Sequence, residues 1–136
     1  PMAGLGFAVG ALFFVTLKLE ITLPFVFAAV AWVGLCAMNC MVIAGRDREC
    51  DAAMAQPSMA RHWAGMERAL PWMALGLAAL ALGAAALEAR WLVLSLAVTA
   101  SALALLELAR RPKLFSAEAR RVWADVVLLT PLLVFL

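Results

Sequence analysis

The sequence has little charge and lacks the composition of a soluble domain. Charged residues make up 15% of the 136 residues, apolar residues make up 67%, and the mean hydropathy is +1.00. Soluble domains are nearer half apolar and a quarter charged, so this composition excludes that class. It also excludes intrinsic disorder, because there is too much apolar surface to leave unburied. A net charge of only +2 gives no support for a nucleic-acid partner. The chain is therefore predicted to fold in lipid.

Residues for disulfide or zinc chemistry are also scarce. The three cysteines, Cys36, Cys40 and Cys50, form no Cys-x-x-Cys pair, and His62 is the only histidine. A zinc site is therefore not expected. Cys36 and Cys40 lie one helical turn apart in an apolar run and are interpreted as small buried apolar residues. The chain also lacks a catalytic triad, a phosphate-binding P-loop and a dinucleotide-binding fingerprint.

Five apolar segments separate the charged clusters and predict an all-α, polytopic bundle of five transmembrane helices. A helix needs about 20 residues to cross the hydrocarbon core, with about 17 as a short limit. Segments below that limit can recruit flanking residues whose charged ends reach the interface. Strands are not expected, because these runs are rich in Ala and Leu and lack alternation with a period of two. The expected helices cover residues 2–17, 21–45, 69–87, 91–107 and 122–136.

Basic residues are distributed unevenly between the connecting loops. The short loops at 18–20 and 88–90 hold two basic residues, whereas the long loops at 46–68 and 108–121 hold nine. By the positive-inside rule, the long loops face the cytoplasm of a bacterial inner membrane. The first helix then enters from the cytoplasmic side and the chain ends on the outer side.

An acidic pattern follows the second apolar segment. Asp47, Glu49 and Asp51 form a D-x-E-x-D sequence. If helicity continues past Gly45, Asp47 and Asp51 lie four residues apart on one face, and the residue between them points away. Two carboxylates at this spacing repel each other, and Mg²⁺ bound between them offsets the repulsion. The simpler alternative is a solvated loop whose surface ion pairs contribute little.

Arginines surround these acids. Guanidinium groups match the geometry of phosphate oxygens, so acids for a metal and arginines for phosphate point to a diphosphate on a lipid-soluble tail. The candidate diphosphate-binding residues are Arg46, Arg48, Arg61 and Arg68.

The same stretch resembles the second aspartate-rich motif of the UbiA superfamily of intramembrane prenyltransferases. In that family, D-x-x-x-D at the cytoplasmic end of a membrane helix is followed seven residues later by Thr or Ser and an apolar pair. Asp51 is followed at this spacing by Ser58, Met59 and Ala60. The ending RRVWADVVLLTPLL also resembles the last helix of the small bacterial branch of the family. The resemblance implies a C-terminal portion, the last five helices, of a nine-helix fold.

The resemblance also implies an activity for the full-length parent. Mg²⁺ would bridge Asp47 and Asp51 to an isoprenoid diphosphate, and the prenyl group would pass to an aromatic acceptor among the membrane lipids. The first aspartate motif of the family is absent from these 136 residues, so the missing N-terminal helices would supply it and the fragment alone is predicted to be inactive. The Gly-Lys/Arg-Thr stretch of the family reads Ala-Gln-Pro-Ser at 55–58. These departures support an alternative, a non-catalytic scaffold or lipid-binding protein of the same descent.

Other polar residues are candidates for supporting roles. Asn39, inside the second segment, is expected to hydrogen-bond across helices or, less favoured, to line the cavity. Asp125 is expected to face the bundle, either paired with Arg121 or holding a loop arginine. Glu49 is expected either to lie beside the metal ligands without contacting the metal or to be solvated. Ser58 is interpreted as a helix cap, with a diphosphate contact as the weaker alternative.

The charge distribution yields a testable topology. Cys50 lies in a predicted cytoplasmic loop, so an impermeant thiol reagent should label it only after cells are opened. Labelling of intact cells, measured by mass shift, would contradict this topology. A Cys50→Ser variant measures the background from the other cysteines.

Overall fold

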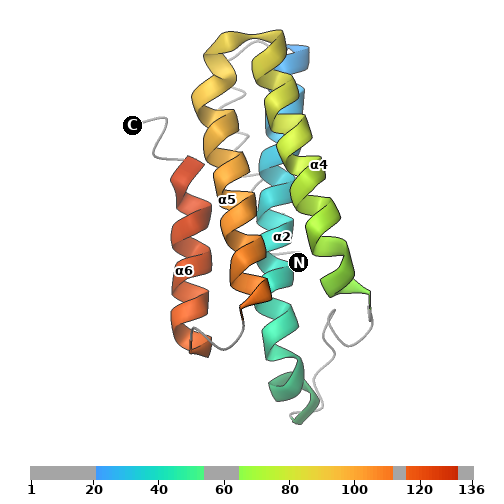
Figure 1. Ribbon diagram of the computed structural model, residues 1–136, viewed down its shortest axis with the longest axis vertical. Coiled ribbons are helices and arrows are strands. Elements are labelled where there is room, and N and C mark those ends of the chain that lie inside the picture. Colours follow the sequence, from blue (N-terminus) through green and yellow to red (C-terminus); the bar gives the residue numbers. More distant parts are fainter. Residues whose placement is uncertain (1–20, 54–64, 112–115, 132–136) are drawn as a thin grey trace.

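The computed structural model describes residues 21–53, 65–111 and 116–131, and these are helical throughout apart from short connections (Figure 1). Helices α2 and α5 run in one direction and α4 and α6 in the other. We call the end where α2 and α5 finish the basic end, and the opposite end, at residues 88–91, the turn end. The elements are α2 (Leu23–Ala53), α4 (Met66–Leu87), the 3-10 helix η1 (Ala89–Trp91), α5 (Leu92–Arg110) and α6 (Ala117–Leu129).

Three helical stretches are long and apolar enough to cross a membrane. They are Leu23–Gly45, Met66–Leu87 and Ala89–Arg110, each of 22 or 23 residues. At about 1.5 Å per residue, this length covers a hydrocarbon core of about 30 Å. The all-α class is confirmed, but the prediction of five transmembrane helices is not. The described residues form four helices, and the expected helix at 2–17 lies outside them.

Helix α2 is longer than the segment predicted for it. The expected end was residue 45, but the helix continues to Ala53, so Asp47 and Asp51 lie in its final turns. Gly45 does not end the helix. It lies where α4 approaches, since an added Cβ would be 3.1 Å from Cε of Met66. The shared face of Asp47 and Asp51 was predicted on the assumption that helicity continues past Gly45. The backbone of α2 is helical there, so this assumption is correct.

Helix α6 differs most from its prediction. It was expected over 122–136, but it covers Ala117–Leu129, only 13 residues, while 132–136 lie outside the described residues. It begins early because Ser116 caps it: the Ser116 hydroxyl accepts a hydrogen bond from the Ala119 amide at 3.2 Å. Glu118 in the first turn adds a favourable interaction with the helix dipole.

Buried side chains form two layers along the bundle. The layer near the turn end combines small residues with two aromatic rings, Phe25 and Trp91, whose centroids lie 6.0 Å apart. The layer nearer the basic end is larger and consists mainly of Leu, Met and Ala from all four helices. Of the two layers, only the second includes a residue of α6, Ala124, so this helix packs on the basic half of the bundle.

The outward side chains of the long helices are apolar. The sequence has no charged residue between Arg68 and Glu88, or between Arg90 and Glu107. In a membrane these apolar side chains would contact lipid, and the backbone N–H and C=O groups hydrogen-bond to each other within each helix. Exposed apolar side chains include Val26, Val30, Trp72, Leu75, Leu82, Val93, Leu96 and Leu103.

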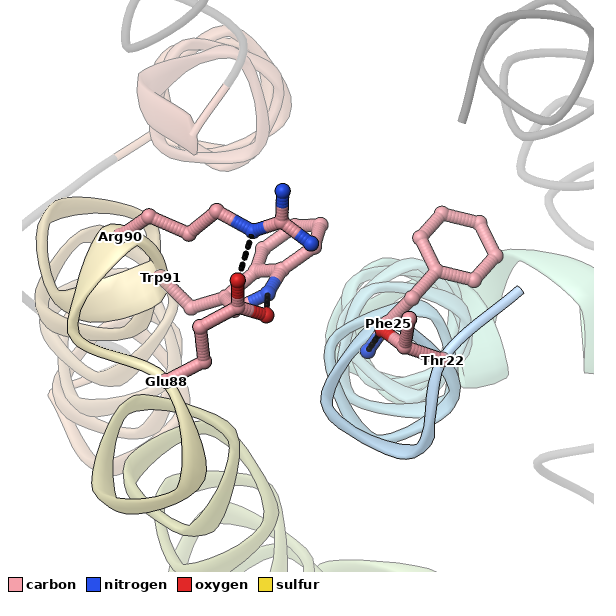
Figure 2. Close-up of polar contacts among 5 residues, drawn as sticks. All are labelled: Thr22, Phe25, Glu88, Arg90 and Trp91. Atoms are coloured by element: carbon pink, nitrogen blue, oxygen red, sulfur yellow. Dashed lines mark hydrogen bonds and ion pairs between the residues drawn. The ribbon is translucent and has the colours of Figure 1, made fainter. Parts of the chain in front are cut away.

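A compact set of polar contacts closes the turn end (Figure 2). The Glu88 carboxylate forms an ion pair with Arg90 Nε at 2.6 Å and accepts a hydrogen bond from Trp91 Nε1 at 3.1 Å. The guanidinium of Arg90 also lies 5.6 Å from the centre of the Trp91 ring, within cation–π range. Because Trp91 packs against Phe25 at the start of α2, these contacts fix the α4–α5 hairpin against α2.

Gly34 permits the close approach of α2 and α4. A Cβ at this position would overlap Cδ2 of Leu77, which is itself buried in the core. We expect Gly34→Val to lower the free energy of unfolding by about 1–3 kcal/mol through overpacking. Denaturation of the detergent-solubilised protein, followed by Trp fluorescence, measures this change.

Gly76 provides the matched control, because an added Cβ there meets nothing within 4 Å. Gly76→Val should have a much smaller effect. The double variant Gly34→Val/Leu77→Ala should recover part of the loss. Equal destabilisation by the two glycine substitutions would show that close approach at Gly34 is not the cause.

Candidate functional site

The basic end gathers most of the residues that the sequence assigned to a site. Arg68 is exposed at the start of α4. Ser58 and Arg61 lie outside the described residues. The final turns of α2 carry Arg46, Asp47, Arg48, Glu49 and Asp51.

The backbone of α2 sets the register of the acidic motif. Asp47 and Asp51 occupy positions i and i+4 and share one face, whereas Glu49 falls on another. Two carboxylates on one helical face suit Mg²⁺, which takes a few carboxylate oxygens and completes its shell with water and phosphate. Among the side chains that the structure describes, no three His, Cys, Asp or Glu come together as a metal site.

A pocket of about 410 Å³ lies between all four helices at the basic end. This volume is within the range of small-molecule sites. Among the described residues, three charged side chains line it: Glu67 of α4, Arg110 of α5 and Arg120 of α6. The rest of the wall is mostly apolar and includes Met41, Val42, Met66, Leu70 and Leu106.

Arg120 was not among the predicted site residues. Its side chain is only 4% exposed, although the sequence placed it in a loop and used it only for the topology. The early start of α6 at Ser116 makes residue 120 helical. It then shares the inward face with Ala124 and Val127, at i+4 and i+7. This spacing is the sequence signal that could have identified it.

Arg110 reaches the pocket from a small surface network. Glu107 is shared by Arg111, whose Nε lies 2.9 Å from Oε2, and by Arg110, whose guanidinium nitrogen lies 4.0 Å from Oε1. All three side chains are more than half exposed, so these ion pairs contribute little to stability. Of the two arginines, Arg110 lines the pocket and Arg111 does not.

Pro71 adds hydrogen-bonding capacity to the α4 side of the pocket. It was expected near a helix start, but it lies inside α4, which begins at Met66. Proline has no amide hydrogen, so the Glu67 carbonyl four residues earlier receives no helical hydrogen bond from it. Both Glu67 and Pro71 line the pocket. The residue Glu67 therefore carries two acceptors, its carboxylate and its main-chain carbonyl.

Asn39 and Asp125 are placed differently from their predictions. Asn39 is buried, but its Oδ1 has no hydrogen-bond partner among the described residues. It does not line the pocket and lies one turn deeper than Val42, which does. Asp125 is exposed, so the expectation that it faces the bundle is wrong. The inward face of α6 is instead set by Ala124, which is fully buried.

Comparisons of the chain with protein-family models, with curated proteins and with solved structures found no match. Membership of the UbiA superfamily therefore stays a prediction from the motif.

The orphaned oxygen of Asn39 leads to a stability prediction. A buried acceptor without a partner costs about 1–3 kcal/mol, so we expect Asn39→Leu, a substitution of similar size, to stabilise the protein by about 1 kcal/mol. Unfolding in detergent micelles measures the difference.

Ser101→Ala is the control, because it removes a hydrogen bond that is made: the Ser101 hydroxyl donates to the Val127 carbonyl at 3.0 Å. That variant should be less stable than the parent. A destabilised Asn39→Leu protein would show that the amide makes a favourable interaction.

Proposed function

We propose that this chain is a membrane-embedded portion of a UbiA-type prenyltransferase. In the full-length parent, the enzyme would transfer a prenyl group from an isoprenoid diphosphate to an aromatic acceptor. The observation that carries the proposal is the continuation of α2 to Ala53. It holds Asp47 and Asp51 at helical spacing at the end of a membrane-length helix.

The charge around this end supports an anionic substrate. Arg68 lies in the first turn of α4, and Arg110 and Arg120 line the pocket at the same end. By the positive-inside rule, this basic end would face the cytoplasm. A diphosphate in the aqueous phase could then reach the α2 motif while its apolar tail remains among the membrane helices.

The chemistry divides between the motif and the bundle. Asp47 and Asp51 would supply the carboxylate ligands of Mg²⁺, which, when bound, would offset the charge of the departing diphosphate. Arg46, Arg48, Arg61 and Arg68 would hold phosphate oxygens as the allylic C–O bond breaks. The apolar helices would exclude water from the prenyl cation until the acceptor attacks it. The missing N-terminal helices of the parent would contribute the first aspartate motif.

A second candidate function is lipid binding without catalysis. The observation that favours it is the pocket itself, whose charged lining among the described residues is Glu67, Arg110 and Arg120. None of these residues belongs to the aspartate motif, so the pocket can bind an anion even if the motif binds no metal.

Substitutions in the motif test prenyl transfer in the full-length parent. Asp47→Asn or Asp51→Asn should lower Mg²⁺-dependent turnover by about a hundredfold or more, because each removes a metal ligand. Glu49→Gln should be much milder, since its position falls on another face of α2. Turnover is measured with a radiolabelled prenyl diphosphate in nanodiscs, with circular dichroism as the control for folding.

Two outcomes would count against this proposal. Equal losses from all three substitutions would contradict the two-aspartate geometry. Full activity in all three would favour the non-catalytic lipid-binding protein. The 136-residue chain alone should show no turnover, because it lacks the first motif.

A further inference from the structure

We infer that the outer face of α6 is the contact surface of a two-fold dimer of this chain in the membrane, with the two α6 helices parallel. This outer face consists of Val122, Val126 and Leu129 and of the polar residues that flank them. The inference depends neither on prenyl transfer nor on the pocket at the basic end.

A hydrogen bond fixes the depth of α6 in the bundle. The Ser101 hydroxyl of α5 donates to the Val127 carbonyl of α6 at 3.0 Å, so these two residues lie at one level. By the helical rise, Ser101 lies about 14 Å from Arg110 and about 18 Å from Ala89, the two ends of a membrane-length stretch. The hydrocarbon core is about 30 Å thick, so this level is close to the middle of the membrane.

Asp125 is an exposed acid at nearly this depth. Helix α6 runs antiparallel to α5 at the edge of the bundle, so Asp125 is about 3 Å nearer the basic end than Val127 (Figure 1). Its side chain is exposed, does not line the pocket, and has no ion-pair partner among the described residues. Ionisable side chains are costly in hydrocarbon and almost always face protein or a water-filled cavity. The outer face of α6 is therefore expected to contact protein.

The apolar residues of this face have the spacing of a helix–helix seam. Val122, Val126 and Leu129 are 62%, 47% and 49% exposed, and they follow one another at i, i+4 and i+7. Two helices that pack side by side meet at this spacing. The seam lies opposite the face that packs on the bundle, where Ala124 is fully buried. A second helix can therefore reach the seam without displacing α5.

The two flanks of the seam carry complementary groups. Glu118 and Asp125 lie on one flank, and both are exposed acceptors. The other flank carries two exposed donors, the Trp123 indole N–H and the Thr130 hydroxyl. Thr130 follows the last residue of α6 but keeps helical backbone angles, so it continues the same face.

This arrangement selects a second copy of the chain as the partner. In a parallel pair of helices, a residue on the first flank faces the residue five positions later on the second flank of the other helix. Asp125 then accepts a hydrogen bond from Thr130 of the second copy, and Glu118 accepts one from Trp123 of the second copy. A two-fold axis repeats both contacts, because the same surface is used by both subunits. The axis runs along the membrane normal, so both basic ends stay on one side of the membrane.

Oxidative cross-linking in liposomes tests the contact. In the 136-residue chain with its native cysteines replaced by Ala, Val126→Cys should form a disulfide-linked dimer, because the axis brings residue 126 of the two copies together. Leu103→Cys is the matched control, since it is 53% exposed at a similar depth but lies on α5, and it should stay monomeric. Circular dichroism verifies that both variants are helical. Equal cross-linking at the two positions would show random collision and would overturn the inference.

Mixed cross-linking tests the parallel orientation. Chains with Val122→Cys and chains with Leu129→Cys, distinguished by a mass tag, are reconstituted together. Parallel helices should give only like-with-like products, because residues 122 and 129 lie about 10 Å apart along the helix. A product that joins residue 122 to residue 129 would overturn the parallel arrangement.

Variants of the polar contacts test the complementarity. Asp125→Leu and Thr130→Val should each weaken the dimer about tenfold in a fluorescence energy-transfer titration, because each removes both symmetry-related hydrogen bonds. The double variant should lose no more than either single variant. Thr99→Val is the matched control: the hydroxyls of Thr99 and Thr130 both donate to the carbonyl four residues earlier in their own helices. Tighter association of Asp125→Leu would show that the acid opposes contact and would overturn the inference.

The full-length parent separates a second copy from the parent's own helices. The Val126→Cys dimer should form there as it does in the 136-residue chain. Cross-linking that is lost in the parent would show that the missing N-terminal helices cover α6 and would overturn the dimer. A monomer in both proteins would overturn it as well.

Discussion

Most features of this protein follow from the lack of water around the middle of its three long helices. In hydrocarbon, backbone groups must bond within each helix, and apolar side chains gain little by leaving lipid for protein. The helices therefore associate through close approach and through hydrogen bonds of small polar side chains. Leu77 packs over Gly34 between α2 and α4, and the Ser101 hydroxyl joins α5 to a carbonyl of α6. In each case a small residue brings two backbones near each other.

The same constraint drives charge to the two ends of the bundle, where it is used differently. At the turn end, Glu88 forms an ion pair with Arg90 and accepts a hydrogen bond from Trp91. The charges of Glu88 and Arg90 are therefore balanced within one short connection. At the basic end, the described residues of the pocket wall include two arginines and one glutamate, and one of the arginines is buried. The turn end is therefore a structural closure, and the basic end has the charge to attract an anion.

Two kinds of anion chemistry are proposed side by side at that end. The acids of α2 require a metal before they can hold a phosphate group, because carboxylates alone repel it. The pocket needs none, because its arginines carry the positive charge themselves. The apolar bundle serves both, since either ligand would keep its tail among the helices.

Hydropathy and length alone determined the all-α class, the apolar segments that form the centres of α2, α4 and α5, and the gathering of basic residues at one end, because these depend only on how the chain partitions between lipid and water. They also predicted five transmembrane helices, whereas three stretches of the described residues are long and apolar enough to cross a membrane. They could not place the ends of the helices. An apolar segment stops at its first charge, whereas helical hydrogen bonding continues, so α2 extends through Asp51 and α6 begins at Ser116. Which face of α6 turns inward depends on the helices that it meets. Only the packed bundle decided that Arg120 is buried and Asp125 exposed, and only there do residues of four separate helices enclose one pocket.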